Sequence, residues 1–259
     1  MKRNEAFNSI AELYDEVRPS YPNKLIEDII NNTKITTESS LLEIGPGTGK
    51  ATIKLAEKGF KIRGVELSEN MTKLLREKCT NYPKVEVEVA SFESWQPKND
   101  EKYQVVYCAQ AFHWIDKALS YKKCYELLED GGYLALFWYQ PVAEKSELKE
   151  EINNIISKYE SKSKTKNEEE HTPSQLTEMR KVEFASSGFF KDVQVFEYTI
   201  ENSMNAKEYI KVINSYSGFA VLEEAVRLSL DKEVEQAINN HGGKITSGLN
   251  YSLFLGKRI

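Results

Sequence analysis

Apolar side chains recur at helical spacing near the beginning of the chain. Between residues 5 and 16, Ile10 and Leu13 fall on one face of a predicted helix. Two prolines in the segment 18–22 end that helix, because each proline disfavours helical backbone in the residue before it. Residues 23–31 return to helical spacing, so two helices are expected before the first strand.

From residue 41 onward, short apolar runs alternate with amphipathic stretches. The runs predict strands and the stretches between them predict helices, a pattern that is typical of βαβ units around a parallel sheet. The predicted strands are 41–44, 61–66, 85–89, 103–108, 133–138, 193–200 and 251–255. The predicted helices are 118–128, 144–159, 206–215 and 222–239, with two earlier ones capped by Thr48 and Ser68.

One polar segment interrupts this pattern. Residues 157–170 are nearly all Ser, Lys, Thr, Asn and Glu, and such a stretch buries too little apolar surface to order itself. We expect a mobile loop there, with the role of a lid. The expected organisation is one domain over 1–259, with a helical cap over 1–32, a ligand-binding core over 33–140, and the loop, extra helices and last two strands over 141–259.

The composition is that of an ordinary globular protein, with 40% hydrophobic and 29% charged residues. The net charge of −5 gives no sign of the basic face that nucleic acid requires, so no nucleic-acid partner is expected. The beginning of the chain does not resemble a signal peptide, and no stretch approaches the roughly 20 apolar residues of a membrane span. We therefore expect no membrane partner.

The cysteines and histidines indicate neither a metal site nor a disulfide framework. Cys79, Cys108 and Cys124 form no CxxC pair, and the three histidines are too far apart for HxxH or HxxxH spacing. A metal-independent protein of the reducing cytoplasm is the expectation.

The clearest candidate for chemistry is a glycine-rich turn between the first core strand and the next helix. Glu43 precedes Gly45, Gly47 and Gly49, and Glu66 ends the following strand. Glycines at the carboxyl end of a parallel strand allow the backbone to approach a ligand closely, and a carboxylate on the next strand can accept hydrogen bonds from ribose hydroxyls.

Two cofactor classes use such a turn, and the spacing separates them. The dinucleotide fingerprint GxGxxG would place its third glycine one residue later, and Pro46 removes an amide that a pyrophosphate would need. S-adenosylmethionine (SAM) has no phosphate, and Glu43 suits its amino end.

The segment Glu43-Ile44-Gly45-Pro46-Gly47-Thr48-Gly49 resembles motif I of the class I SAM-dependent methyltransferases. The resemblance covers about residues 7–138. It implies an α/β fold with a Rossmann-like, doubly wound, seven-stranded and mostly parallel sheet under a helical cap. It also implies SAM as the cofactor, with S-adenosylhomocysteine as the product. The cofactor contacts that it implies are Glu43, Gly45, Gly47, Gly49, Glu66, Leu67, Ser91, Phe92, Cys108, Gln110 and Tyr14, although the family usually has Asp where this chain has Ser91.

The segment 108–116 indicates the kind of acceptor. It lacks the N/D-P-P-Y/F motif of DNA and protein-amide methyltransferases and resembles the A-x-A-F/L-H-W-x-D stretch of small-molecule methyltransferases of the trans-aconitate and ubiquinone-biosynthesis types. His113 is a candidate general base or a hydrogen-bonded residue of the pocket wall. Arg18, Tyr21 and Trp114 are candidate acceptor contacts, or alternatively packing and surface residues.

Three functions remain open at this stage. The first is methyl transfer to the O, N or C atom of a small molecule, by a monomer or a homodimer. The second is an NAD-dependent oxidoreductase, which the glycine spacing disfavours. The third is a non-catalytic, SAM-binding regulatory protein, which the glycine turn does not distinguish from the first.

Overall fold

The computed structural model describes residues 11–142, 146–159, 172–215, 219 and 222–259. The chain divides into two compact units. The sheet unit comprises Pro19–Tyr139, Leu176–Tyr198 and Tyr251–Ile259, and the helical unit comprises Met1–Arg18, Gln140–Gln175 and Thr199–Asn250. The single-domain organisation expected from the sequence remains a prediction.

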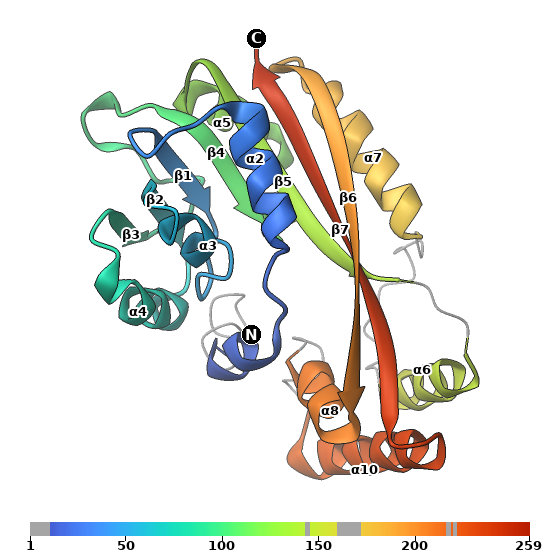
Figure 1. The fold of residues 1–259 in the computed structure, drawn as a ribbon. Coiled ribbons are helices and arrows are strands. Elements are labelled where there is room, and N and C mark those ends of the chain that lie inside the picture. The colour runs from blue at the N-terminus through green and yellow to red at the C-terminus, as the bar shows by residue number, and fades with distance from the viewer. Residues whose placement is uncertain (1–10, 143–145, 160–171, 216–218, 220–221) are drawn as a thin grey trace. The chain divides into compact units, whose positions relative to one another are not determined.

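Seven strands form one sheet in the order β3-β2-β1-β4-β5-β7-β6 (Figure 1). The four pairs between β1, β2, β3, β4 and β5 are parallel. This arrangement confirms the predicted seven-stranded, mostly parallel sheet. The strands are β1 (Ser40–Ile44), β2 (Lys61–Glu66), β3 (Val85–Val89), β4 (Tyr103–Ala109), β5 (Leu128–Pro141), β6 (Phe190–Asn205) and β7 (Lys244–Arg258).

The last two strands run in opposite directions. The amide of Ile259, after β7, donates to the carbonyl of Phe189, before β6, at 3.2 Å. Farther along, Thr199 Oγ1 donates to Asn250 Oδ1 at 3.4 Å. The two pairs of residues, 189 with 259 and 199 with 250, show that the strands are antiparallel. Figure 1 shows the two arrows side by side with opposite directions.

Burial follows the sequence pattern of each strand. β4 is almost continuously apolar and buried along most of its length, as a central strand covered on both faces must be. β3 has the alternating sequence VEVEV, and its glutamates remain partly or fully exposed. The core of the sheet unit gathers around β1, β4 and β5, and it includes Leu42, Val106 and Leu134, each 0% exposed.

The described helices are α2 (Asn23–Thr33), α3 (Thr52–Ala56), α4 (Glu69–Lys78), α5 (Lys117–Leu127), α6 (Glu147–Tyr159), α7 (Pro173–Ala185), α8 (Ala206–Asn214) and α10 (Glu224–Asn240), with 3-10 turns η1 (Cys79–Asn81), η2 (Lys98–Asp100) and η3 (Phe112–Trp114). The helical unit has a core of its own, which joins α6, α8 and α10. No helix among the described residues is long and apolar enough to cross a bilayer.

Two helix starts were predicted from capping residues, and the structure bears out one of them. Ser68 caps α4 as predicted, because its hydroxyl accepts the amide of Met71 at 3.2 Å. The expected cap at Thr48 is wrong, since α3 begins at Thr52 and has no side-chain cap. Gly49, directly after Thr48, has φ of +90°, which is outside the helical range, so the helix cannot start at Thr48.

Helix α7 was not predicted from the sequence. Phe184 is its buried residue, so the helix has no stripe of apolar residues along one face. Of the predicted first helix, the part from residue 11 to 16 is helical, and residues 5–10 lie outside the described residues. Of the predicted loop, residues 157–159 belong to α6 and residues 160–170 lie outside the described residues.

Candidate functional site

The glycine-rich turn follows β1 and has backbone that ordinary residues rarely adopt. Gly45, Gly47 and Gly49 have φ of +64°, +57° and +90°. A Cβ on Gly45 would come within 2.7 Å of Ala111 Cβ, and one on Gly49 within 2.4 Å of Leu75 Cδ1. The turn is thus held tightly between the segment after β4 and helix α4, and its glycines are a steric requirement.

Glu66, at the carboxyl end of β2, is bound directly to this turn. The amide of Gly47 donates to its Oε2 and the amide of Ser68 to its Oε1, both at 2.8 Å. Burial raises the pKa of this carboxyl group, and the backbone amides work in the opposite direction. Each carboxylate oxygen can accept more than one hydrogen bond, so the pair retains capacity for the hydroxyls of a ligand.

Glu43 lies in β1 directly opposite Tyr107 in β4, and this register brings the two side chains together. Its Oε2 accepts from Thr52 Oγ1 at 2.6 Å and from Tyr107 Oη at 2.8 Å. Its Oε1 is buried and has no hydrogen-bond partner among the described residues. Complete burial, with a smaller contribution from Glu66, raises the pKa of Glu43 to about 7. A buried carboxylate oxygen without a donor is a place for a donor from a ligand or water.

The other expected cofactor residues lie around the same strand ends. Leu67 is 43% exposed beside the buried Glu66, and Phe92 is buried beneath the turn that follows β3. Ser91 already bonds within that turn, because its hydroxyl lies 3.0 Å from that of Ser94. Cys108 is completely buried, and burial raises its thiol pKa well above the ordinary value. It is a packing residue with no reactive thiolate.

Gln110, the first residue after β4, has a left-handed backbone with φ of +60°. Its amide donates to the carbonyl of Phe137 at 3.0 Å and its side chain to the carbonyl of Tyr139 at 2.9 Å. These two bonds to β5 hold a conformation that costs a non-glycine residue of the order of 1 kcal/mol or more. Strain of this kind gathers at functional sites, and Gln110 lies two residues before η3.

His113 and Trp114 occupy η3 and are both exposed, Trp114 by 46%. Their rings lie 4.7 Å apart. The indole nitrogen of the buried Trp138, in β5, donates to His113 Nδ1 at 3.2 Å. The sequence did not predict this role of Trp138, because a tryptophan within an apolar strand is expected only to pack in the core.

Tyr21, Tyr14 and Arg18 fall in two different units. Tyr21 is 6% exposed in the sheet unit and packs edge-on against Phe137, with ring centroids 4.8 Å apart. Tyr14 and Arg18 belong to the helical unit, where the guanidinium lies 5.2 Å from the Tyr14 ring centroid and Nη2 donates to the carbonyl of Ser215 at 3.2 Å. Their predicted roles toward cofactor and acceptor remain predictions.

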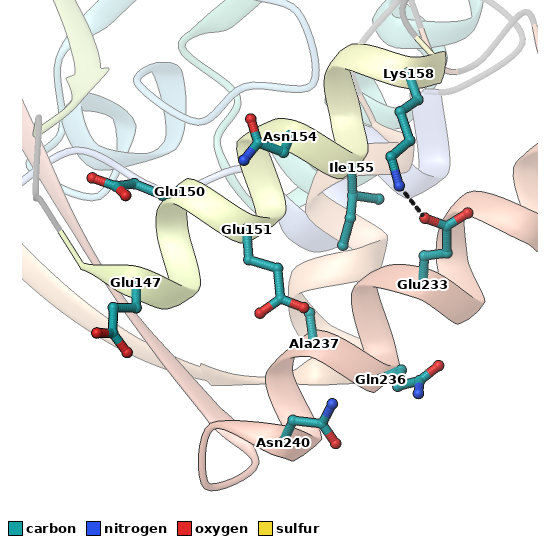
Figure 2. A pocket seen from close by; sticks show the side chains of 10 residues that line it. All are labelled: Glu147, Glu150, Glu151, Asn154, Ile155, Lys158, Glu233, Gln236, Ala237 and Asn240. Carbon is teal, nitrogen blue, oxygen red and sulfur yellow. Dashed lines mark hydrogen bonds and ion pairs between the residues drawn. The ribbon is translucent and has the colours of Figure 1, made fainter.

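A cavity of about 540 Å³ opens between α6 and α10 of the helical unit. Its lining is polar, and Lys158 is paired with Glu233 at 3.0 Å, as Figure 2 shows. The residues that line it are Glu147, Glu150, Glu151, Asn154, Ile155, Lys158, Glu233, Gln236, Ala237 and Asn240, and none of them was a candidate from the sequence. Within the described part of the chain, no group of three or more His, Cys, Asp or Glu side chains is arranged to hold a metal ion.

Comparisons with known proteins agree with this geometry. Residues 41–132 match the family described as a methyltransferase domain. An uncharacterized methyltransferase of Schizosaccharomyces pombe is 32% identical over 126 residues, which are 48% of this chain and 49% of the relative. A methyltransferase-like protein of the same yeast is 27% identical over 229 residues, 86% of this chain and 82% of that protein.

The solved structures include the phosphoethanolamine N-methyltransferase 2 of Haemonchus contortus with phosphomonomethylethanolamine and S-adenosylhomocysteine. Its TM-score is 0.55 at 16% identity, over 99% of this chain and 57% of that one, which is a likeness of fold. The chain spans about half the length of several curated relatives that it matches, 49% and 51% for two of them. Residues 41–132 thus match a methyltransferase domain, and the fold of the chain resembles that of a solved methyltransferase.

Proposed function

We propose that this protein transfers a methyl group from SAM to a small-molecule acceptor. The observation that carries the proposal is the link between Gly47 and Glu66, in which a loop amide and a buried carboxylate meet at 2.8 Å. The link places a tight glycine cradle beside an acceptor of hydroxyl hydrogen bonds. The carboxylate suits the ribose diol of SAM, and the glycine turn allows the backbone to approach the cofactor closely.

The same link disfavours a dinucleotide. A pyrophosphate requires loop amides directed at it and a helix N-terminus behind them. Here the amide of Gly47 already donates to Glu66, and the helix that follows, α3, has only 5 residues.

The remaining contacts follow from the placement of each residue. Glu43, with its buried and unpartnered Oε1, suits the amino group of SAM directly or through a water molecule. Glu66 would hold the ribose, and Leu67, Ser91 and Phe92 would surround the adenine. Bound SAM supplies an electrophilic methyl group on a positively charged sulfur.

The protein's own task is to orient the acceptor and to exclude water. A nucleophile must lie in line with the methyl group at about 3–3.5 Å, and this positioning supplies much of the rate in a displacement whose leaving group needs no help. We propose His113 and Trp114, after the end of β4, as acceptor contacts, together with Arg18 and Tyr21, and Tyr14 as a cofactor contact.

The proposal for the acceptor and for the cellular compartment rests on composition. A net charge of −5 and the lack of a base-methylation motif favour a metabolite over nucleic acid. Cys79, Cys108 and Cys124 are free thiols in the structure, which suits a reducing compartment such as the cytoplasm.

Thermal unfolding with SAM, S-adenosylhomocysteine, NAD or no ligand tests the proposal. A ligand at about 100 times its dissociation constant stabilises the folded state by about 2.7 kcal/mol, a shift of roughly 5–10 °C at this size. A shift with SAM and S-adenosylhomocysteine only is expected. A shift with NAD alone would replace the proposal by a dinucleotide site. Binding of SAM without turnover across a broad acceptor panel would identify a regulatory protein.

A further inference from the structure

The hydrogen bond between Trp138 and His113 determines where the proton of the imidazole lies. An indole nitrogen only donates, so His113 Nδ1 must accept through its lone pair. A neutral imidazole carries one proton, and with Nδ1 as acceptor that proton lies on Nε2. A proton on Nδ1 would place two N–H groups against each other at 3.2 Å.

The donor in this bond is itself rigidly held. Trp138 is 4% exposed, and its ring meets the edge of Phe254 with centroids 5.6 Å apart. The guanidinium of Arg180, in α7, lies 4.2 Å from the indole centroid. Burial lowers the pKa of Arg180 to about 10, so the group is still a cation at neutral pH. A cation over the ring face draws electron density from the indole and strengthens its N–H as a donor.

The position of His113 gives this tautomer a consequence. Ala111, two residues before it, lies in contact range of the glycine-rich turn at Gly45. His113 therefore belongs to the strand end where a cofactor would lie, and its ring is exposed there.

We propose that Trp138 is a positioning residue that fixes His113 in the Nε2–H tautomer, so that the ring has no basic nitrogen with which to take a proton from the methyl acceptor. The lone pair of Nδ1 is engaged by the indole, and Nε2 already carries its proton. His113 then takes no proton from the acceptor. This assignment rests on the proposed function only in assuming that an acceptor is bound near η3.

A second histidine provides a contrast within the same molecule. His241 Nδ1 lies 2.9 Å from the carbonyl oxygen of Ala237. A carbonyl oxygen only accepts, so His241 must carry its proton on Nδ1. The structure thus gives His113 and His241 opposite tautomers.

The test is nitrogen NMR on the full chain labelled with ¹⁵N in histidine and tryptophan, at neutral pH without ligand. Long-range proton–nitrogen spectra identify which ring nitrogen carries the proton, and His113→Gln assigns the His113 signals by their loss. We expect a bare Nδ1 on His113, a protonated Nδ1 on His241, and a scalar coupling between the Trp138 indole nitrogen and His113 Nδ1. A proton on Nδ1 of His113 would overturn the proposal.

Two tryptophan variants separate a positioning role from a structural one. In Trp138→Phe the coupling disappears, and the His113 nitrogen signals move toward an average of the two tautomers. Trp95→Phe is the matched control, because Trp95 is 5% exposed and its indole donates to Glu88 Oε2 at 3.2 Å. That variant loses a comparable bond and leaves the His113 signals in place. His113 signals that are the same in Trp138→Phe as in the wild type would also overturn the proposal.

Calorimetry with S-adenosylhomocysteine on the same samples distinguishes this inference from the proposed function. If the wild-type protein does not bind S-adenosylhomocysteine, the proposed function is wrong, whichever tautomer His113 has. Normal binding together with the wrong tautomer removes only the role of Trp138. Trp138→Phe is expected to bind S-adenosylhomocysteine within about threefold of wild type, since none of the proposed cofactor contacts involves the indole.

Discussion

Two groups of acidic residues on or next to strands β1 to β4 differ in the groups that bind their carboxylates. The Arg63 cluster consists of Arg63, Glu86, Glu88 and Glu101, with Arg63 Nη1 at 2.6 Å from Glu86 and 3.1 Å from Glu88. Burial lowers the pKa of Arg63 and the three carboxylates raise it, with a net rise. The cluster brings its own cation and lies mostly at the surface.

The carboxylate pair at the glycine-rich turn, Glu43 and Glu66, is held by neutral groups. Backbone amides and two hydroxyls donate to it, and Glu43 Oε1 receives no bond within the described chain. The carboxylates of the Arg63 cluster are already neutralised by an arginine. The buried carboxylates of Glu43 and Glu66 have only neutral donors and can still bind a ligand. The difference separates acidic residues that support the fold from those expected to bind.

The largest effect is expected from Gly47→Val. A β-branched residue at φ of +57° is strained, and its side chain would grow toward Met71 Sδ, which already lies 3.5 Å from a built Cβ. We expect SAM binding to be lost in calorimetry while the helix content, measured by circular dichroism, stays near wild type. Gly188→Val is the control, since Gly188 has φ of +80° with nothing within 4 Å, and it should cost stability without affecting SAM.

Glu43→Gln is expected to change how stability depends on pH. A folded-state pKa of about 7, against an ordinary value of 4.5, means that the stability linked to Glu43 is full below pH 4.5 and is lost as the pH rises through about 7. The neutral amide removes this loss, so the variant should gain on wild type by up to about 3 kcal/mol between pH 5 and pH 8.

Urea unfolding at the two pH values measures this difference. Tyr107→Phe is the matched variant, because it removes one of the two hydroxyls that donate to the carboxylate, and it should steepen the wild-type loss with pH. If Glu43→Gln changes the free energy of unfolding equally at pH 5 and pH 8, then folding does not raise the pKa of Glu43.

Glu66→Ala should weaken SAM binding by about 1.5–3 kcal/mol, roughly 10- to 150-fold, because charged hydrogen bonds to the ribose are lost. The loop amide of Gly47 also loses its partner, so the turn should become less ordered. Calorimetry gives the affinity directly. Unchanged affinity would remove Glu66 from the site.

The smallest effect is expected from Glu86→Ala in the Arg63 cluster. Glu86 has a side chain that is 61% exposed, and Glu88 and Glu101 remain beside Arg63 after the change. Surface ion pairs contribute about 0–1 kcal/mol, so unfolding should change by less than about 1 kcal/mol and SAM affinity not at all. A loss of SAM affinity as large as that of Glu66→Ala would end the distinction between the two groups.

Much of this protein was accessible from the sequence because its signals are local. Alternation of apolar runs with helical stretches predicted the seven strands, since βαβ units repeat the same hydrophobic pattern. The motif from Glu43 to Gly49, followed by Glu66, predicted the methyltransferase domain, because three glycines and two carboxylates at fixed spacing define the turn. Ser68 was recognisable as a cap because capping depends on residues next to each other in the chain.

Contacts between distant segments were decided by the tertiary structure alone. The bond from Trp138 to His113, the hydroxyl of Tyr107 on Glu43 and the approach of Ala111 to Gly45 each depend on the register between neighbouring strands. Helix α7 has little apolar periodicity, so the hydrophobic pattern did not predict it. Composition and spacing establish which residues are available, but the protonation and pairing of each depend on neighbours that only the packed sheet supplies.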